Sequence, residues 1–272
     1  MDRQSGIGRA GRGQPLQINW LGRVPYRDAW DLQHRLVAAR AEGRIPDQLL
    51  LLEHEPVLTL GRHSDPAHVL ASTVDLAARG VELIRVERGG EVTYHGPGQL
   101  TGYPIVKLAD RGLLIRPFVR ALEVALAGAC AEFGVEAGPR PGLPGCWCGG
   151  DPNAAAGDPA GARKIGAIGI RIERGVSYHG IALNVSVRLA DFELIDACGM
   201  PGVQSTSVDR ELGVEAPPST QSVARAAAAF AVSLGRALDV PISGSLPPAA
   251  GPERVRSGLE ELLGGVVTAG GR

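Results

Sequence analysis

The sequence has little cysteine, few aromatic residues, almost no net charge and no long apolar run. Four cysteines in a chain of 272 residues do not make the disulfide framework of a small secreted domain, and we interpret them as reduced thiols. A net charge of −1 gives no footprint for nucleic acid, and the 4% of aromatic residues carries no functional information. No segment approaches the roughly 18 to 20 apolar residues that span a bilayer, and the start lacks an apolar signal core. We therefore expect a cytoplasmic globular protein that binds neither membranes nor nucleic acid.

Composition favours one main domain with a tail at each end. Apolar residues make up 44% and charged residues 21%, which is usual for a globular protein with a single core. Residues 1–14 contain glycines and arginines but little that is apolar, so we predict a flexible tail there. The apolar pattern ends after Pro241, which predicts a flexible or weakly ordered tail over residues 241–272. The main domain then covers residues 15–240.

The apolar pattern of the main domain predicts strands interspersed with helices. Ile168 and Ile170 alternate with polar or small residues, Arg174-Gly175 supplies a turn, and Ile181 and Leu183 alternate on the return, which predicts a β-hairpin. A hairpin excludes a purely parallel sheet. We predict an α+β fold, with a mixed, largely antiparallel sheet and helices packed on one face. The other predicted strands are 16–21, 49–52, 57–60, 81–86 and 103–108, and the helices are 26–41, one that begins at Pro117, and 219–238.

Residues 88–102 are rich in glycine and are predicted to form a loop. Glycines let the backbone approach a ligand closely and present its N–H groups, although an ordinary turn has the same composition. Tyr94 and His95 favour a substrate-binding loop, because a simple turn needs neither an aromatic ring nor an imidazole. His95 is expected to position the substrate rather than to act as the base.

Residues 138–163 contain glycine, proline, alanine and aspartate without periodicity, and we predict a surface excursion rather than a core element. Cys146 and Cys148 lie in this segment. They suggest a metal site, but no second Cys/His pair stands at zinc-finger spacing, so we predict that no metal is bound. Cys130 falls within the helix that begins at Pro117 and is expected to belong to the core.

Lys164 and Cys198 form a candidate catalytic pair. A thiol with an ordinary pKa of ~8.5 is only a few per cent thiolate at neutral pH, and a nearby ammonium favours the charged form. Lys164 opens a glycine-bearing loop, and Gly199 beside the cysteine frees a neighbouring N–H for an oxyanion. Taken singly, a lysine is more often solvated and a cysteine more often buried. Taken together, they suggest acyl transfer through a thioester, with the amine moving protons.

Five short motifs follow one another along residues 16–235. They are Arg88-Gly89-Gly90, Thr93-Tyr94-His95-Gly96-Pro97-Gly98-Gln99-Leu100, Lys164-Ile165-Gly166-Ala167-Ile168-Gly169, His179-Gly180-Ile181-Ala182-Leu183-Asn184 and Cys198-Gly199. In this order they resemble the lipoyl(octanoyl) transferases of lipoate biosynthesis. The resemblance implies a catalytic domain with the fold of biotin and lipoate protein ligases. It also implies transfer of an octanoyl group from octanoyl-acyl carrier protein to a lysine of a lipoyl domain, through a cysteine thioester.

The resemblance also assigns roles and partners. Cys198 would hold the acyl thioester, and Lys164 would lower the pKa of its thiol. The acceptors would be the lipoyl domains of 2-oxoacid dehydrogenases and the H protein of glycine cleavage, with no metal or other cofactor. His179 and Asn184 are expected to be structural braces. Substrate contacts are expected from Arg88, Gly89, Gly90, Glu91, Val92, Thr93, Tyr94, His95, Ala167, Ile168, Gly169, Gly180, Ile181 and Ala182.

Two other functions stay open from the sequence. An ATP-dependent lipoate or biotin ligase on the same fold would form an adenylate and would need no cysteine nucleophile, so Cys198 argues against it. A catalytically silent paralogue that binds lipoyl domains or acylated carriers would not require Lys164 and Cys198 together. Residues 143–163 are longer than the family pattern predicts before the lysine. The sequence does not determine the preferred acyl chain length or the oligomeric state.

Overall fold

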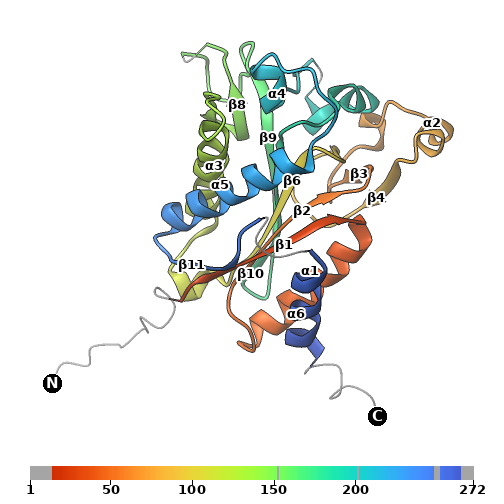
Figure 1. Cartoon of the computed structure of the whole chain (residues 1–272). Coiled ribbons are helices and arrows are strands. Elements are labelled where there is room, and N and C mark those ends of the chain that lie inside the picture. Colours follow the sequence, from red (N-terminus) through yellow and green to blue (C-terminus); the bar gives the residue numbers. More distant parts are fainter. Residues whose placement is uncertain (1–13, 152, 201, 248–251, 265–272) are drawn as a thin grey trace.

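A large sheet forms the centre of the protein in the computed structural model, which describes residues 14–151, 153–200, 202–247 and 252–264 (Figure 1). The first strand of the chain is parallel to both of its neighbours, and every other neighbouring pair is antiparallel. The predicted mixed, largely antiparallel sheet is therefore confirmed. Its eight strands lie in the order β11 (Ile242–Ser245), β1 (Leu16–Val24), β2 (Gln48–His54), β6 (Gln99–Ile105), β10 (Val176–Asn184), β9 (Arg163–Glu173), β8 (Leu143–Cys148) and β7 (Gly138–Arg140).

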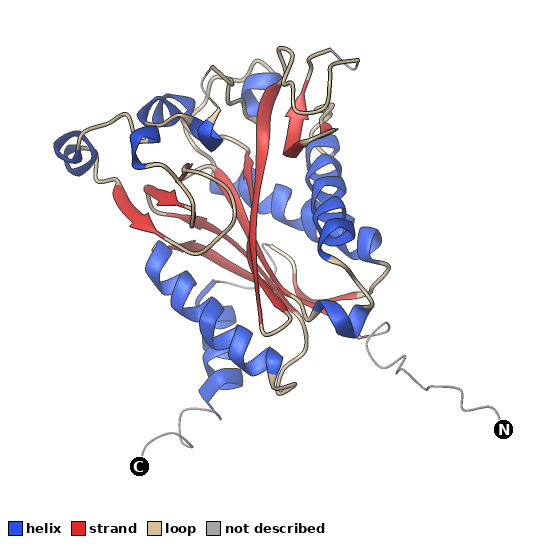
Figure 2. Ribbon diagram, turned by 180° about the vertical axis from the view of Figure 1, so that it is seen from behind, coloured by secondary structure: helices blue, strands red, loops and turns tan. Residues whose placement is uncertain are grey.

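Helices cover both faces of this sheet (Figures 1 and 2). On one face α3 (Ile115–Ala131) and α5 (Thr220–Leu238) pack together, and on the other lie α1 (Tyr26–Ala41) and α6 (Pro252–Gly264). The apolar run in β2 explains the arrangement, because Leu49 and Leu51 enter one core while Leu50 and Leu52 enter the other. The prediction of helices on one face was wrong, since a strand that is apolar on both sides needs two covers.

A smaller sheet stands beside the large one. Residues 86–92 connect two of its strands, and residues 88–92 of this connection line a cavity. Its order is β4 (Glu82–Arg85), β3 (Val57–Leu60) and β5 (Thr93–His95), with β3 parallel to β4 and antiparallel to β5. Around it lie α2 (Thr73–Ala78) and the 3₁₀ helices η1 (Pro66–His68), η3 (Leu189–Leu194) and η4 (Ala197–Gly199). The two sheets separate at the polar residues between β2 and β3, two strands that the sequence predicted as separate.

Local sequence signals set the ends of the long helices. Ser219 caps α5, because its side chain accepts a hydrogen bond from the N–H of Ser222, and Asp239 ends that helix in a left-handed conformation with φ of 54°. The prediction of helix 26–41 matches α1, and Pro117 lies in the first turn of α3, where its missing N–H has no helical partner to lose. A Cβ on Gly128 would come within 2.3 Å of the Ser233 hydroxyl, so glycine allows α3 and α5 to pack closely.

The segment 88–102 is not a continuous loop. It contains β5 and the start of β6, and β6 is buried along its whole length between β2 and β10. Gly102 and Gly180 face each other there, since a Cβ on Gly180 would lie 2.1 Å from the Gly102 carbonyl oxygen. Glycine in this segment serves close strand packing as well as turns, and composition does not distinguish the two.

Residues 138–163 also differ from the prediction of a surface excursion. They include β7 and β8, and Cys146, Trp147 and Cys148 are all buried. Residues 153–161 that follow are turns and are mostly exposed, as predicted. Cys146 and Cys148 pack in the same apolar cluster as Cys130, which confirms the expected core position of Cys130.

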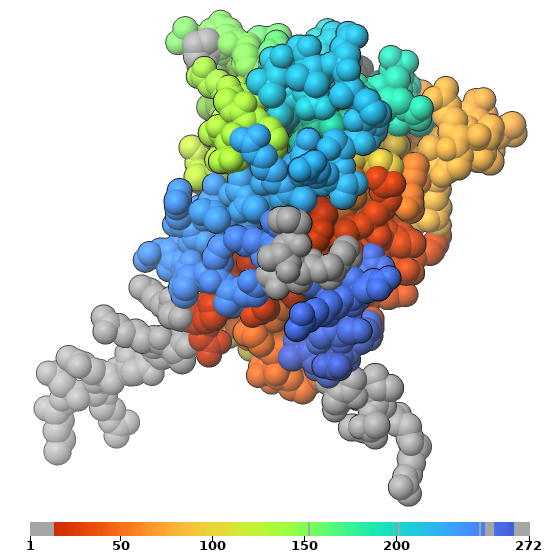
Figure 3. Space-filling model, in the orientation of Figure 1, coloured from red at the N-terminus to blue at the C-terminus, as the bar shows by residue number. Residues whose placement is uncertain are grey.

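The segment 241–272 contains two packed elements where a weakly ordered tail was predicted. β11 extends the large sheet beside β1, and α6 packs against β1 and α1, where it buries Leu259 and Leu263 (Figure 3). Arg35 forms a bidentate ion pair with Glu260 at 2.7 Å. Both elements are held by partners distant in sequence. The predicted tail at residues 1–14 lies outside the described residues except for Gln14. No helix in the described ranges is both long and apolar enough to cross a membrane.

Candidate active site

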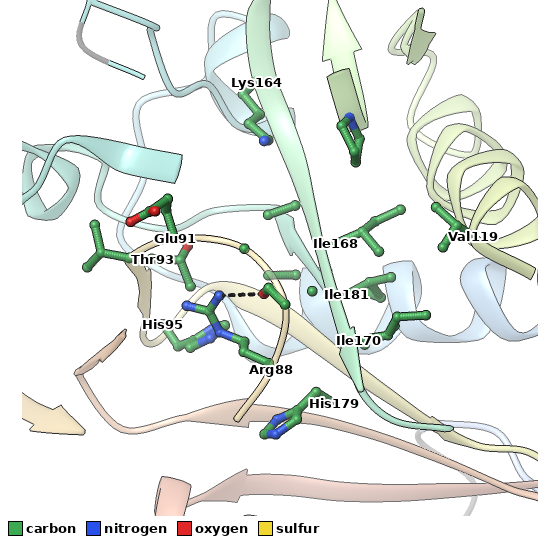
Figure 4. Close-up of a pocket in the computed structure, with 18 of the residues that line it drawn as sticks. Arg88, Glu91, Thr93, His95, Val119, Lys164, Ile168, Ile170, His179 and Ile181 are labelled. Carbon is green, nitrogen blue, oxygen red and sulfur yellow. Dashed lines mark hydrogen bonds between the residues drawn. The ribbon is translucent and has the colours of Figure 1, made fainter. Parts of the chain in front are cut away.

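A cavity of about 460 Å³ opens between α3, the loop after β4 and the hairpin of β9 and β10 (Figure 4). Lys164 stands toward one end and His179 toward the other, and Ile168, Ile170 and Ile181 lie between them. The cavity therefore combines an apolar middle with polar ends. Its lining residues are Tyr26, Arg88, Gly89, Gly90, Glu91, Val92, Thr93, His95, Tyr103, Val119, Gly142, Leu143, Pro144, Lys164, Ala167, Ile168, Gly169, Ile170, His179, Gly180, Ile181, Ala182 and Met200.

All of the substrate contacts expected from the sequence line this cavity, except Tyr94. Side chains alternate along β5, so Thr93 and His95 face the cavity while Tyr94 turns away. The Tyr94 hydroxyl donates to the Asp191 carboxylate at 2.9 Å, and its ring packs edge-on against Phe192. Tyr94 therefore joins β5 to η3.

Glycines bring the loop at residues 88–92 directly onto β9. The N–H of Gly89 donates to the carbonyl of Ile170 at 3.1 Å, and a Cβ on Gly169 would lie 2.7 Å from the Gly89 carbonyl oxygen. Arg88 is buried, and its guanidinium donates to the carbonyl oxygen of Thr59 at 2.6 Å and to its hydroxyl at 2.9 Å. These contacts fix the loop as one wall of the cavity.

Lys164 lies inside β9, not in the loop that the sequence predicted. Its N–H donates to the Gln204 carbonyl at 2.8 Å, and its own carbonyl accepts from the Thr206 N–H at 2.9 Å. The side-chain nitrogen lies 4.9 Å from the ring centroid of Trp147, the residue paired with it on β8. With 9% of its surface exposed, Lys164 presents an amine to the cavity from a fixed backbone.

Cys198 lies in the short helix η4, and its side chain is outside what the structure describes. The neighbouring Met200 lines the same cavity as Lys164. The N–H groups of Gly199 and Met200 donate to the carbonyls of Asp196, at 3.0 Å, and Ala197, at 3.3 Å. The predicted oxyanion role is therefore not available to these two groups in this conformation, because the 3₁₀ turn uses both.

His95 has a defined tautomer. Asn184 donates to the Thr206 carbonyl and accepts from the Gln99 amide nitrogen, which also donates to the Tyr94 carbonyl. The Gln99 oxygen consequently faces His95 and accepts from Nδ1–H at 2.7 Å. Burial lowers the pKa of His95 well below its ordinary value, so the ring is neutral and its Nε2 is an acceptor. This series of hydrogen bonds confirms that Asn184 is a structural brace, as predicted.

His179 differs from the brace that the sequence suggested. Its backbone has φ of 52° inside β10, its side chain is 1% exposed, and neither ring nitrogen has a hydrogen-bond partner among the described residues. Its Nε2 stands 3.7 Å from the Glu87 carboxylate, beyond hydrogen-bonding distance. Burial lowers the pKa of His179, so a neutral imidazole contributes to the polar end of the cavity.

Part of the cavity wall comes from residues that no sequence motif indicated. Tyr26 comes from α1, Tyr103 from β6 and Val119 from α3, while Leu143 and Pro144 belong to β8. Within their own segments these residues look like ordinary core or loop residues. Because they come from separate elements, a local sequence pattern carries no signal for their convergence.

Among the described residues, no three His, Cys, Asp or Glu side chains form a group suited to a metal ion. The buried polar groups around the cavity are instead two histidines, two tyrosines, an arginine, a lysine and a threonine. The arrangement offers an amine at one end and hydrogen-bonding groups at the other, on either side of an apolar slot. Such a site suits a ligand with an apolar chain and a reactive polar head.

Two solved structures share the overall architecture. Lipoate-protein ligase A bound with ATP matches with a TM-score of 0.62 and 17% identity, covering 92% of this chain and 95% of that one. A bi-partite lipoate protein ligase from Thermoplasma acidophilum matches with a TM-score of 0.61 and 16% identity, covering 95% of each chain. The fold is therefore that of the lipoate protein ligases, as the resemblance implied.

Sequence comparison then identifies the family. The model of the lipoyl protein ligase A/B catalytic domain matches residues 25–231, and the chain belongs to this family. The octanoyltransferase of Acidobacterium capsulatum is 46% identical over 220 residues, which cover 78% of this chain and 87% of that relative. The octanoyltransferase of Nocardia farcinica is 40% identical over 252 residues, covering 89% and 93%. These findings confirm the family resemblance.

Proposed function

We infer that the protein is an acyltransferase of lipoate biosynthesis and transfers octanoyl groups. Relatives of that name match most of the chain at 40–46% identity. We further propose that the donor is octanoyl-acyl carrier protein, that the acceptor is a lysine of a lipoyl domain, and that Cys198 carries the acyl group between them. That the reaction takes place in the cytoplasm stays a prediction.

The observation that carries this proposal is the composition of the cavity. Ile168, Ile170 and Ile181 give it an apolar wall, and Lys164 lies at one end of that wall. Met200, two residues after Cys198, lines the same cavity. An acyl thioester on Cys198 would therefore have an apolar slot for its chain and an amine beside its segment.

In the first step the Cys198 thiolate attacks the carbonyl carbon of the octanoyl thioester. The new carbon–sulfur bond forms as the bond to the carrier sulfur breaks, and the Lys164 ammonium gives its proton to the departing thiolate. The products are octanoyl-Cys198, a neutral Lys164 amine and the free thiol of the carrier. Exchange of one thioester for another is nearly balanced in free energy, so positioning and an available thiolate set the rate.

In the second step the acceptor lysine releases one proton to solvent and attacks octanoyl-Cys198 as a neutral amine. The amide bond forms, the bond to the Cys198 sulfur breaks, and the remaining proton moves from the attacking nitrogen to Lys164. This restores the Cys198 thiolate and the Lys164 ammonium. The site needs no nucleotide, because the thioester already supplies an activated carbonyl.

Mass spectrometry of the intact protein tests the intermediate. After incubation with octanoyl-acyl carrier protein and no acceptor, we expect one added octanoyl group in the wild type and none in Cys198→Ala. Cys130→Ala is the matched control, because it removes a buried core thiol outside the cavity and should keep the adduct. An unmodified wild-type protein under conditions of active transfer would exclude the thioester.

The ligase alternative has a separate test. The same acceptor is incubated with free octanoate, Mg²⁺ and ATP in place of the acylated carrier. We expect no octanoylation of the lysine and no ATP-dependent release of pyrophosphate. Efficient modification from the free acid would replace the transferase with an adenylate-forming ligase.

A further inference from the structure

We propose that Trp147 is the positioning residue of the catalytic pair, seating the amine of Lys164 and holding the chain next to Cys198. The inference rests on the proposed function, because it assigns Trp147 a task through those two residues. In the sequence, Trp147 stands between two cysteines in a segment for which a surface excursion was predicted. In the structure it is 3% exposed and belongs to β8.

The first contact is between the Trp147 ring and the Lys164 side chain. The side-chain nitrogen lies over the ring at 4.9 Å from its centroid, within the range in which an ammonium is attracted to an aromatic face. Both side chains are buried, so water screens this attraction little. The contact restricts where the amine points.

The ring itself is held in place. Its Nε1–H donates to the Leu143 carbonyl at 3.2 Å within the same strand. The pairing of β8 with β9 shifts register between Cys146 and Trp147, which sets Trp147 opposite Lys164. Gly145 has φ of 128°, and a Cβ there would lie 3.1 Å from Cε of Lys164, so glycine leaves room for the lysine stem.

The second contact reaches the segment that follows Cys198. Trp147 forms a small apolar cluster with Leu143 and Ala162, against which Met200 and Val203 pack. The Trp147 ring therefore contacts the lysine amine, and the cluster that contains the ring packs against the chain two residues beyond Cys198. The 33 residues between Lys164 and Cys198 are thus bridged by packing on the cluster that contains Trp147, as well as by the backbone bonds of Lys164 to residues 204 and 206.

A double-mutant cycle tests this role in the full-length protein. Trp147→Leu keeps an apolar side chain without the aromatic face and should lower kcat for octanoyl transfer by about 5- to 30-fold, the rate equivalent of a buried cation–π contact. The KM for the acylated carrier should change little. Trp147→Phe keeps an aromatic face and should lose less. In a Lys164→Ala background, Trp147→Leu should cause no comparable further loss.

The pH dependence of thiol alkylation gives a second readout, which packing alone would not move. In Trp147→Leu the alkylation of Cys198 should shift to higher pH, because the lysine charge is held less firmly beside the thiol. Trp20→Leu is the matched control. Trp20 is 5% exposed in the core on the α3 and α5 face, so its loss should lower the Tm without shifting that profile.

Two results would overturn the proposal. One is an equal loss of kcat from Trp147→Leu with Lys164 present or absent. The other is an identical loss in the Phe and Leu variants that follows the fall in Tm alone. Failure of the proposed function would look different, because the wild type itself would then form no octanoyl adduct and transfer no octanoyl group from the acylated carrier.

Discussion

The hydroxyl of Tyr94 donates to the buried carboxylate of Asp191 at 2.9 Å and so ties β5 to η3, the helix that precedes Cys198. Arg188 also bonds Asp191, and the Tyr94 ring packs on Phe192. A residue that sequence motifs place among the substrate contacts therefore connects the cavity wall with the chain leading to Cys198.

Tyr94→Phe should destabilise the fold by about 1.5–3 kcal/mol, the usual contribution of a hydrogen bond to a charged group. The variant keeps the aromatic ring. At temperatures where it is folded, its activity should therefore fall mainly through kcat. Tyr178→Phe is the control, since the Tyr178 hydroxyl bonds Glu173 at the hairpin end and should contribute less. Urea unfolding and steady-state kinetics measure both effects, and equal losses in the two variants would contradict the assignment.

Gly169→Ala should impair transfer more than it impairs folding. A Cβ at Gly169 would stand 2.7 Å from the Gly89 carbonyl oxygen and would push the loop at residues 88–92 off β9. We expect at least about a tenfold fall in kcat/KM, the equivalent of about 1.4 kcal/mol. Gly258→Ala in α6 is the control, because nothing lies within 4 Å of a Cβ there. Kinetics that match those of Gly258→Ala would remove the loop from the substrate site.

Acid should destabilise the protein before its carboxylates titrate. His54 is fully buried between the Val24 carbonyl and the Tyr103 hydroxyl, and burial lowers its pKa to about 4. The unfolded chain binds a proton near pH 6.5 and the folded chain only near pH 4, so stability falls as pH drops through that window. The loss from His54 alone is about 3 kcal/mol.

Urea unfolding from pH 7.5 to 4 measures this slope. His34→Gln is the control, since the His34 side chain is 42% exposed and should contribute little. His54→Gln should be less stable at pH 7.5 but should show a shallower slope. A slope unchanged by His54→Gln would assign the acid sensitivity to other groups.

Ending the chain after residue 247 should destabilise it. The deletion removes α6 and uncovers the apolar surface that Leu259 and Leu263 bury against α1. Two buried leucines contribute about 3–6 kcal/mol by transfer free energy, and ordering the helix offsets part of this gain. Differential scanning calorimetry should show a lower Tm, and Arg35→Gln, which removes the ion pair with Glu260, should lower it far less. An unchanged Tm would contradict this packing and would favour the weakly ordered C-terminal tail that the sequence predicted.

Short-range patterns in the sequence determined much of this protein. Helices α1 and α5, the hairpin of β9 and β10, and the break between β2 and β3 follow from helical or two-residue periodicity, caps and turn residues, which act within a few residues. The glycine-bearing motifs also identified most of the cavity wall, since a close backbone approach has a local signature.

Only the tertiary structure decided which distant segments meet. It joined β11 and α6 to the core, buried β8, turned Tyr94 away from the cavity and placed the Trp147 ring against Lys164. Each of these depends on strand register or on packing between residues far apart in the chain, for which a local pattern carries no information. The sequence named Lys164 and Cys198 as a pair, and long-range packing brings Lys164 and the segment of Cys198 to one cavity.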